Sequence, residues 1–68
     1  MKIHYDPHAD ALSVRFSDTE IIESEEVTAG SIFDFDSKGR IVAVEILHAS
    51  DRLAEGIDLE AIARQQAA

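Results

Sequence analysis

Hydrophobic and polar residues alternate along the first part of the chain with the two-residue period of a half-buried β-strand. Met1 to Tyr5 alternates until Asp6-Pro7 ends the pattern, and the clearest stretch runs from Ala11 to Ser17. Because Asp and Pro favour tight turns, residues 6–10 are expected to join these two strands into a hairpin. One face of the hairpin is apolar and the other polar, which is typical of a sheet that meets water on one side.

A second hairpin is predicted for Ser31 to Asp36 and Arg40 to Leu47, with Gly39 in the turn where a positive φ is needed. The second of these strands carries apolar side chains on both faces. Such a strand is covered on both sides, one by a C-terminal helix and the other, we expect, by a curled sheet or another chain. The possible partner or dimer face consists of Ile41, Ala43 and Leu47. A charged residue at Ile41 or Val42 is expected to disrupt folding and association together.

The rest of the chain predicts one weak strand and a short helical segment. Ile21 to Val27 contains the acidic stretch Glu23 to Glu26, so we expect an irregular edge strand whose charges discourage pairing with other edges. Ser50 is expected to cap a short helical turn, and Asp58 a second helix. Together these patterns predict an α+β fold, with an antiparallel β-meander of about four strands over residues 1–48 and a short C-terminal helix within residues 50–66.

The length of the chain, 68 residues, predicts a single domain, residues 1–68, of marginal stability. A chain of this size buries only about 60% of the surface that its unfolded form exposes. The sequence contains no cysteine, which excludes disulfides, thiol catalysis and Cys-ligated zinc. Good packing, self-association or a partner chain are therefore the expected sources of stability.

The charge of the chain limits its partners. Six Lys and Arg residues stand against fourteen Asp and Glu residues, which gives a net charge of −8. A field of this sign repels phosphate backbones and anionic membrane surfaces, so we expect no nucleic-acid binding and no membrane binding. No signal-like apolar segment is present, and no segment approaches the roughly 20 residues of a membrane-spanning helix, so a cytoplasmic location is expected.

Several short motifs follow one another in the order found in one small prokaryotic family. They are Tyr5-Asp6-Pro7, Ala9-Asp10-Ala11-Leu12, Glu23 to Val27, Phe33 to Asp36, Gly39 to Val42, Val44 to Leu47 and Ala49-Ser50. On these motifs the chain resembles the domain-of-unknown-function family 2283 from Met1 to about Leu53. The resemblance implies a compact β-meander plus helix and no established activity. Family members are often suspected of being small partner proteins, some in toxin–antitoxin-like arrangements.

The polar side chains of these motifs are the candidate interaction residues. They are Tyr5, Asp6, Asp10, Asp34, Asp36 and Glu45. Around the first turn one reading is a recognition patch. The other is a structural turn in which Asp6 and Asp10 accept hydrogen bonds from turn N–H groups while Tyr5 packs beneath them.

Glu45 interrupts an otherwise apolar strand face, so partial burial would raise its pKa and suit it to acid–base chemistry. The alternatives for Glu45 are an ion pair with Arg15 or Arg40, or a place at a subunit interface. A metal site is the other chemical alternative, formed by His4, His8 and Asp10 around the first turn. Against it, His4 falls on the polar face of its strand, and surface histidines near carboxylates are common without a metal.

The sequence therefore predicts a small acidic protein-interaction module without catalysis or cofactor. We expect it to form a homo-oligomer or to pair with a protein partner, in the most specific version as an antitoxin-like partner of a basic protein. The rival prediction is a minimal metal-binding or hydrolytic domain that uses His4, His8 and nearby carboxylates. No Ser-His-Asp arrangement, Gly-rich phosphate loop or cofactor motif supports an enzyme.

Overall fold

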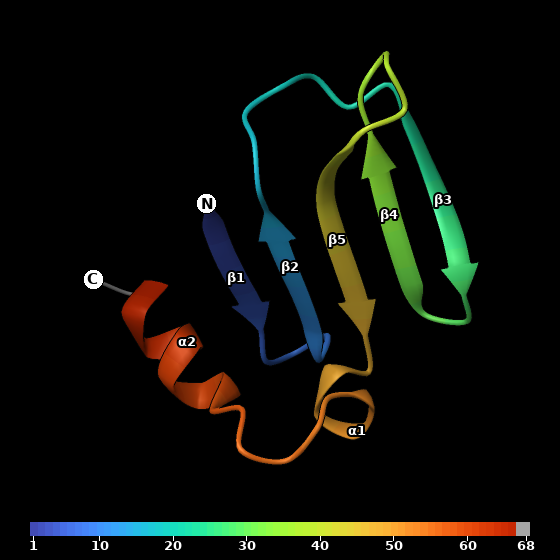
Figure 1. Ribbon diagram of the computed structural model, residues 1–68. Coiled ribbons are helices and arrows are strands. Elements are labelled where there is room, and N and C mark those ends of the chain that lie inside the picture. The colour runs from blue at the N-terminus through green and yellow to red at the C-terminus, as the bar shows by residue number, and fades with distance from the viewer. Residues whose placement is uncertain (67–68) are drawn as a thin grey trace.

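The computed structural model describes residues 1–66, which form a five-stranded antiparallel sheet and two short helices (Figure 1). The strands are β1 (Lys2–Asp6), β2 (Ala11–Arg15), β3 (Glu23–Thr28), β4 (Ser31–Phe35) and β5 (Ile41–Leu47), and the helices are α1 (Ala49–Arg52) and α2 (Leu59–Gln66). The α+β class is confirmed, but there are five strands rather than about four, because the acidic stretch also pairs in the sheet. The last two residues of the predicted domain lie outside the described part.

The strand order corrects the predicted meander. The order across the sheet is β1-β2-β5-β4-β3, so β5 lies between β2 and β4, and the chain crosses from β2 to the far edge of the sheet. Figure 1 shows the connecting loop passing beyond the ends of β5 and β4 before it enters β3. The central place suits β5, whose Val42 and Ala43 are buried, whereas acidic β3 lies at an edge where its charges stay hydrated.

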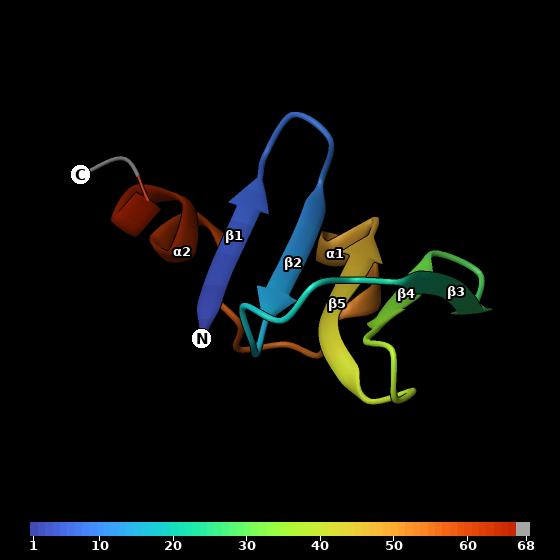
Figure 2. The same ribbon diagram turned by 90° about the horizontal axis from the view of Figure 1, so that it is seen from above.

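The core lies where α2 packs against the β1 side of the sheet (Figures 1 and 2). Its buried centre consists of Tyr5, Leu12 and Ala49, and the partly buried residues packed against it include Leu59, Ile62 and Ala63 of α2. A helix of eight residues is too short to be stable alone, so this docking is what keeps it folded. The predicted cap is confirmed, because Ala61 N donates a hydrogen bond to Asp58 Oδ1 over 2.9 Å.

The start of α1 differs from the prediction that Ser50 is its cap. The helix begins at Ala49, after His48 in the left-handed region with φ 53°, and His48 makes no side-chain cap bond. Ser50 lies inside the helix, and its N–H and hydroxyl both donate to Asp10. The cap of α1 therefore comes from a distant turn, which no pattern of neighbouring residues could indicate.

A β-bulge divides the predicted partner face. Asp34 pairs with Ala43, but the next residue, Phe35, pairs with Ile41, so the register shifts by one residue. Residues paired across antiparallel strands point to the same side, and successive residues point to opposite sides. Ile41 consequently lies on the side of Phe35, while Ala43 and Leu47 lie on the other.

Burial separates the predicted face further. Ala43 is only 5% exposed, whereas Ile41 and Leu47 are 46% and 39% exposed. Val42 is 1% exposed and belongs to the interior. The prediction that a charge disrupts folding and association together therefore stays a prediction for Val42, whereas at the exposed Ile41 we now expect the fold to be kept.

Candidate functional site

The turn between β1 and β2 is held by Asp10, which connects three parts of the chain. The Tyr5 hydroxyl donates to Asp10 Oδ1 over 2.6 Å, and Ser50 donates from its backbone N–H over 3.0 Å and from its hydroxyl over 2.6 Å. In addition, Ala49 N donates to the backbone oxygen of Asp10 over 2.9 Å. Asp10 has φ 52°, a left-handed conformation that Asp tolerates better than most residues. Asp10 thus joins the first hairpin to α1.

The electrostatics of this contact follow from the same hydrogen bonds. The Ser50 and Tyr5 hydroxyls hold the pKa of Asp10 below its usual range, because both bonds favour the ionised carboxylate. The bond to that carboxylate raises the pKa of Tyr5 to about 12, since losing the phenol proton would place two negative charges together. The pair is therefore a neutral phenol and an anion over the ordinary pH range.

The structural reading of the first turn is correct for Asp6 and needs a change for Asp10. Asp6 Oδ1 accepts hydrogen bonds from His8 N over 3.0 Å and Ala9 N over 3.4 Å, as expected of a turn aspartate. Asp10 bonds to α1 instead of to turn N–H groups, and Tyr5 is buried beneath it. These motif residues stabilise the fold.

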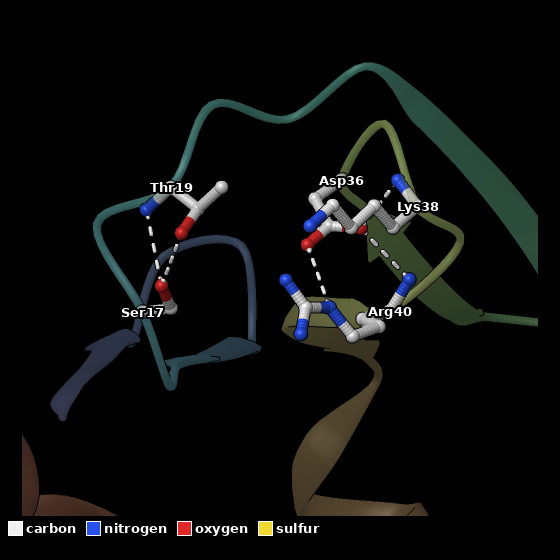
Figure 3. Close-up of polar contacts among 5 residues, drawn as sticks. All are labelled: Ser17, Thr19, Asp36, Lys38 and Arg40. Carbon is white, nitrogen blue, oxygen red and sulfur yellow. Dashed lines mark hydrogen bonds and ion pairs between the residues drawn. The ribbon is translucent and has the colours of Figure 1, made fainter.

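Asp36 has a similar role in the turn between β4 and β5 (Figure 3). Its Oδ1 accepts from Lys38 N and Arg40 N, both over 2.9 Å, and its Oδ2 forms an ion pair with Arg40 Nε at 3.3 Å. The backbone N–H of Arg40 is the main reason that the pKa of Asp36 lies below its usual value. In the neighbouring loop the hydroxyls of Ser17 and Thr19 are 2.7 Å apart and form a hydrogen bond. Each of the two loops is therefore stabilised by hydrogen bonds of its own.

Asp34 and Glu45 are the candidate residues whose carboxyls do not close a turn. Asp34 is 3% exposed, and its Oδ1 accepts a hydrogen bond from the hydroxyl of Ser24 on β3. Glu45 pairs with Ile32, which places it diagonally opposite Asp34 on the same face of the sheet. A hydrogen bond between the two carboxyls, reinforced by burial and by repulsion from Asp34, raises the pKa of Glu45. Among the candidate residues, this carboxyl pair is the one in which two acidic groups interact directly and a pKa is raised as a result.

The expected arginine partners of Glu45 bond elsewhere. Arg15 donates from Nε to Ser17 O over 2.8 Å and from Nη2 to Thr19 O over 3.0 Å, while Arg40 pairs with Asp36. Of the alternatives for Glu45, the structure therefore supports a raised pKa and not these two ion pairs. The carboxyl pair combines Asp34 and Glu45 from the candidate set with Ser24, which sequence reasoning missed.

Replacing Glu45 by glutamine is expected to stabilise the protein at neutral pH. A group whose pKa is raised by folding holds its proton more tightly in the folded state, so its contribution to stability is lost as pH rises through the folded pKa. Glutamine keeps a hydrogen-bond donor for Asp34 and removes the like charge. Relief of such a cross-strand pair is worth about 0.5 kcal/mol, or roughly 2–4 °C in melting temperature.

Thermal melts between pH 3 and pH 8 check this prediction. The gain should be present at neutral pH and should shrink as the pH falls below the pKa of Glu45. Glu25→Gln, an exposed change on β3, controls for the general benefit of removing one negative charge. Equal gains for Glu45→Gln and Glu25→Gln at every pH would show that the carboxyl pair has no special role.

The predicted metal ligands are not brought together. His4 pairs with Ser13 on β2, His8 is exposed at the turn, and Asp10 is bonded to Tyr5 and Ser50. Within residues 1–66, no group of three or more His, Asp or Glu side chains is arranged to hold a metal ion. The arrangement of His4, His8 and Asp10 on which the metal prediction depended is therefore absent from this part of the chain.

The surface of the described residues has two further features. All six residues of β3 are exposed, including Glu23, Glu25 and Glu26. Large apolar side chains are also exposed, namely Met1, Ile3, Phe16, Ile22, Val27, Ile41, Leu47 and Ile57. In this part of the chain no helix is long and apolar enough to cross a membrane, and no pocket is present.

Ser24 and Ser50 are the contact residues that sequence reasoning did not select. Ser50 is 40 positions from Asp10 along the chain, and Ser24 is 10 positions from Asp34. Ser50 belongs to the Ala49-Ser50 motif, so its place in that motif was the available signal. Ser24 lies in the motif Glu23 to Val27 and had the same kind of signal, but it was grouped with the surrounding glutamates.

Comparisons with known proteins give one match. A family model described as "Protein of unknown function (DUF2283)" matches residues 2–50. The matched region contains the five strands, the Asp10 contact with Ser50 and the carboxyl pair, and it ends before α2. No curated protein and no solved structure matches the chain.

Proposed function

Because the chain belongs to the DUF2283 family, whose function is unknown, its role has to be inferred from its own surface, and we propose that it is a non-catalytic protein-interaction module. The concrete version is an antitoxin-like protein that pairs with a basic partner, with self-association through its apolar surface as the second mode. Both modes use the part of the sheet formed by β3, β4 and β5. The supporting evidence is that, apart from the contact of α1 with the end of β5, no helix within residues 1–66 covers this part of the sheet, and that acidic side chains lie along its edge.

The observation that carries the proposal is that the helices of the described residues cover one part of the sheet and leave the other part uncovered. The helix α2 packs against β1, and α1 touches the end of β5, so Tyr5 and Leu12 of the first hairpin are buried. At the other end of β5, Ile41 is exposed, and its register partner Phe35 lies only 6.5 Å, ring centre to ring centre, from Phe33. An exposed apolar side chain beside half-buried aromatic ones is typical of interaction sites.

Exposed apolar residues gather at this end of the sheet. Phe16 N donates to Val42 O, and Ile22 N donates to Phe35 O, both over 2.8 Å. These bonds bring the exposed Phe16 and Ile22 to the strands that carry Ile41 and Phe35. We call Phe16, Ile22, Phe35 and Ile41 the apolar end. Acidic residues precede β3 and run along it, so a partner with apolar side chains flanked by basic ones has the complementary chemistry.

Changing Ile41 to lysine is expected to weaken association while leaving the protein folded. Ile41 is exposed, so its replacement costs little folding energy, but a charge at the centre of the apolar end opposes burial against another chain. Light scattering over a concentration series, at low and high salt, measures the effect. The wild type should rise from 7.5 kDa toward twice that mass, and Ile41→Lys should stay closer to the monomer.

The matched control is Ile57→Lys, which places the same charge on an equally exposed isoleucine outside the sheet. It should associate like the wild type. If the wild type remains a monomer at every concentration, the second arm is a mixture with a lysine-rich peptide, whose binding should raise the melting temperature. A chain that neither self-associates nor responds to the basic peptide would contradict the proposed function.

A further inference from the structure

The two edges of the sheet are not equivalent. The first edge, β1, has α2 packed beside it, as Figures 1 and 2 both show. At the second edge, β3 has β4 on one side, and no other part of residues 1–66 lies along its outer side (Figure 1). All six of its residues are exposed. An open edge presents unpaired N–H and C=O groups that can pair with another strand.

The register identifies which backbone groups of β3 face outward. Leu47 N donates to Gly30 O, so Gly30 and the alternate residues Ile32 and Asp34 point their backbone groups toward β5. Phe33 and Phe35 therefore point theirs toward β3, as the bond from Ile22 N to Phe35 O also requires.

The partners of Phe33 and Phe35 on β3 are Glu25 and Glu23. The backbone groups of these two glutamates consequently face β4. Because the direction alternates along a strand, the N–H and C=O groups of Ser24 and Glu26 point away from the sheet.

The charges along this edge select what could pair with it. Glu23 and Glu25 lie on the face of Phe35 and Phe33, and Glu26 lies on the opposite face. A second copy that paired through its own β3 would set glutamates beside glutamates, in a chain whose net charge is −8. Like charges across paired strands are destabilising, whereas basic side chains at alternate positions would pair with Glu23 and Glu25.

We propose that an extended basic segment of a partner protein adds to β3 as a sixth strand and pairs with the outward backbone groups of Ser24 and Glu26. This inference rests on the proposed interaction function and specifies its partner and docking mode. The segment carries Lys or Arg at alternate positions, beside Glu23 and Glu25. Its backbone supplies the hydrogen bonds, and the charges supply the selectivity.

The test uses two variants at one position and a defined probe. Glu26→Pro removes an outward N–H, and Glu26→Ala keeps it, while both lose the hydrogen bond that Glu26 Oε1 accepts from Gly30 N. The probe is a ten-residue peptide in which Lys and Thr alternate. Its affinity is measured for each variant and for the wild type by NMR titration, with a Glu/Thr peptide as the control of opposite charge.

The expected result is that Glu26→Ala binds the Lys/Thr peptide a few-fold more weakly than the wild type, and that Glu26→Pro binds at least about tenfold more weakly than Glu26→Ala. In the wild type, the amides of Ser24 and Glu26 should become protected from hydrogen exchange when the peptide is bound. This protection checks the docking mode even if the proline variant folds poorly. The Glu/Thr peptide should not bind.

Equal affinities of the two variants, with no added protection at Ser24 and Glu26, would overturn strand addition. That result would leave the proposed function standing, since the peptide would bind by charge alone. Self-association that Glu26→Pro abolishes would make a second copy the occupant and would also overturn the inference. Failure of the proposed function looks different, because neither self-association nor any binding of the basic peptide would be seen.

Discussion

Replacing Val42 by aspartate is expected to leave the protein unfolded at 25 °C. Val42 lies in the central strand and is 1% exposed, so the new carboxylate would have no access to water. The change loses about 2 kcal/mol of apolar burial and adds several kcal/mol for burying an unpaired charge. A domain of this size has about 3–10 kcal/mol of stability in total, so the substitution removes most or all of it.

The neighbouring residue supplies the matched control. Ile41→Asp introduces the same side chain one position earlier, where the native residue is 46% exposed, and this variant should remain folded. Circular dichroism and a thermal melt of the two variants measure the contrast. If Val42→Asp melts as cooperatively as Ile41→Asp, the result would contradict the placement of Val42 in the interior.

Replacing Asp10 by alanine is expected to produce the next largest loss of stability. The change removes three hydrogen bonds, from Tyr5 and from the N–H and hydroxyl of Ser50. It also places alanine at φ 52°, a left-handed conformation that alanine adopts less readily than aspartate. Since bonds to a charged group are the stronger kind, the melting temperature should fall by roughly 10 °C or more.

Two further variants separate the causes of that loss. Asp10→Asn keeps a residue that tolerates the left-handed conformation and removes the charge, whereas Ser50→Ala removes one of the donors. The pH dependence gives an independent check, because folding lowers the pKa of Asp10.

The stability that the ionised Asp10 contributes is present above its unfolded pKa and is lost as the pH falls through its folded pKa. Across the acid range, the melting temperature should therefore depend less steeply on pH for Asp10→Asn than for the wild type. A variant with the full acid sensitivity of the wild type would rule out this carboxylate as the source. Glu45→Gln should show the opposite pH dependence. Its gain in melting temperature should grow as the pH rises, since the pKa of Glu45 is raised.

The local features of the fold were accessible from sequence patterns. Alternation located the hairpin of β1 and β2, Asp6 marked its turn, and Asp58 marked the start of α2. These features depend on interactions between residues a few positions apart. Periodicity and turn chemistry describe such interactions directly, which is why they were predicted correctly.

The candidate site was accessible only in part. The carboxylates Asp34 and Glu45 were selected, but their contact with each other was not foreseen, and neither was the role of Ser24. Asp10 was selected as a turn residue, and its partner Ser50 lies 40 positions away. Contacts of this kind depend on strand order and register, and a single-residue bulge between Asp34 and Phe35 changes which side chains share a face.

By itself, the sequence determined the strand-rich α+β class, the turns of the two hairpins, the cap at Asp58, the family and the net negative charge. The tertiary structure decided that β5 lies in the middle of the sheet and that β3 is an open edge. It also decided that Val42 is interior while Ile41 is surface, and that Asp34 meets Glu45. The physical reason is that local patterns encode which residues are apolar and where the chain turns. Burial and long-range pairing depend in addition on the order and register of the strands, which are fixed only in the folded structure.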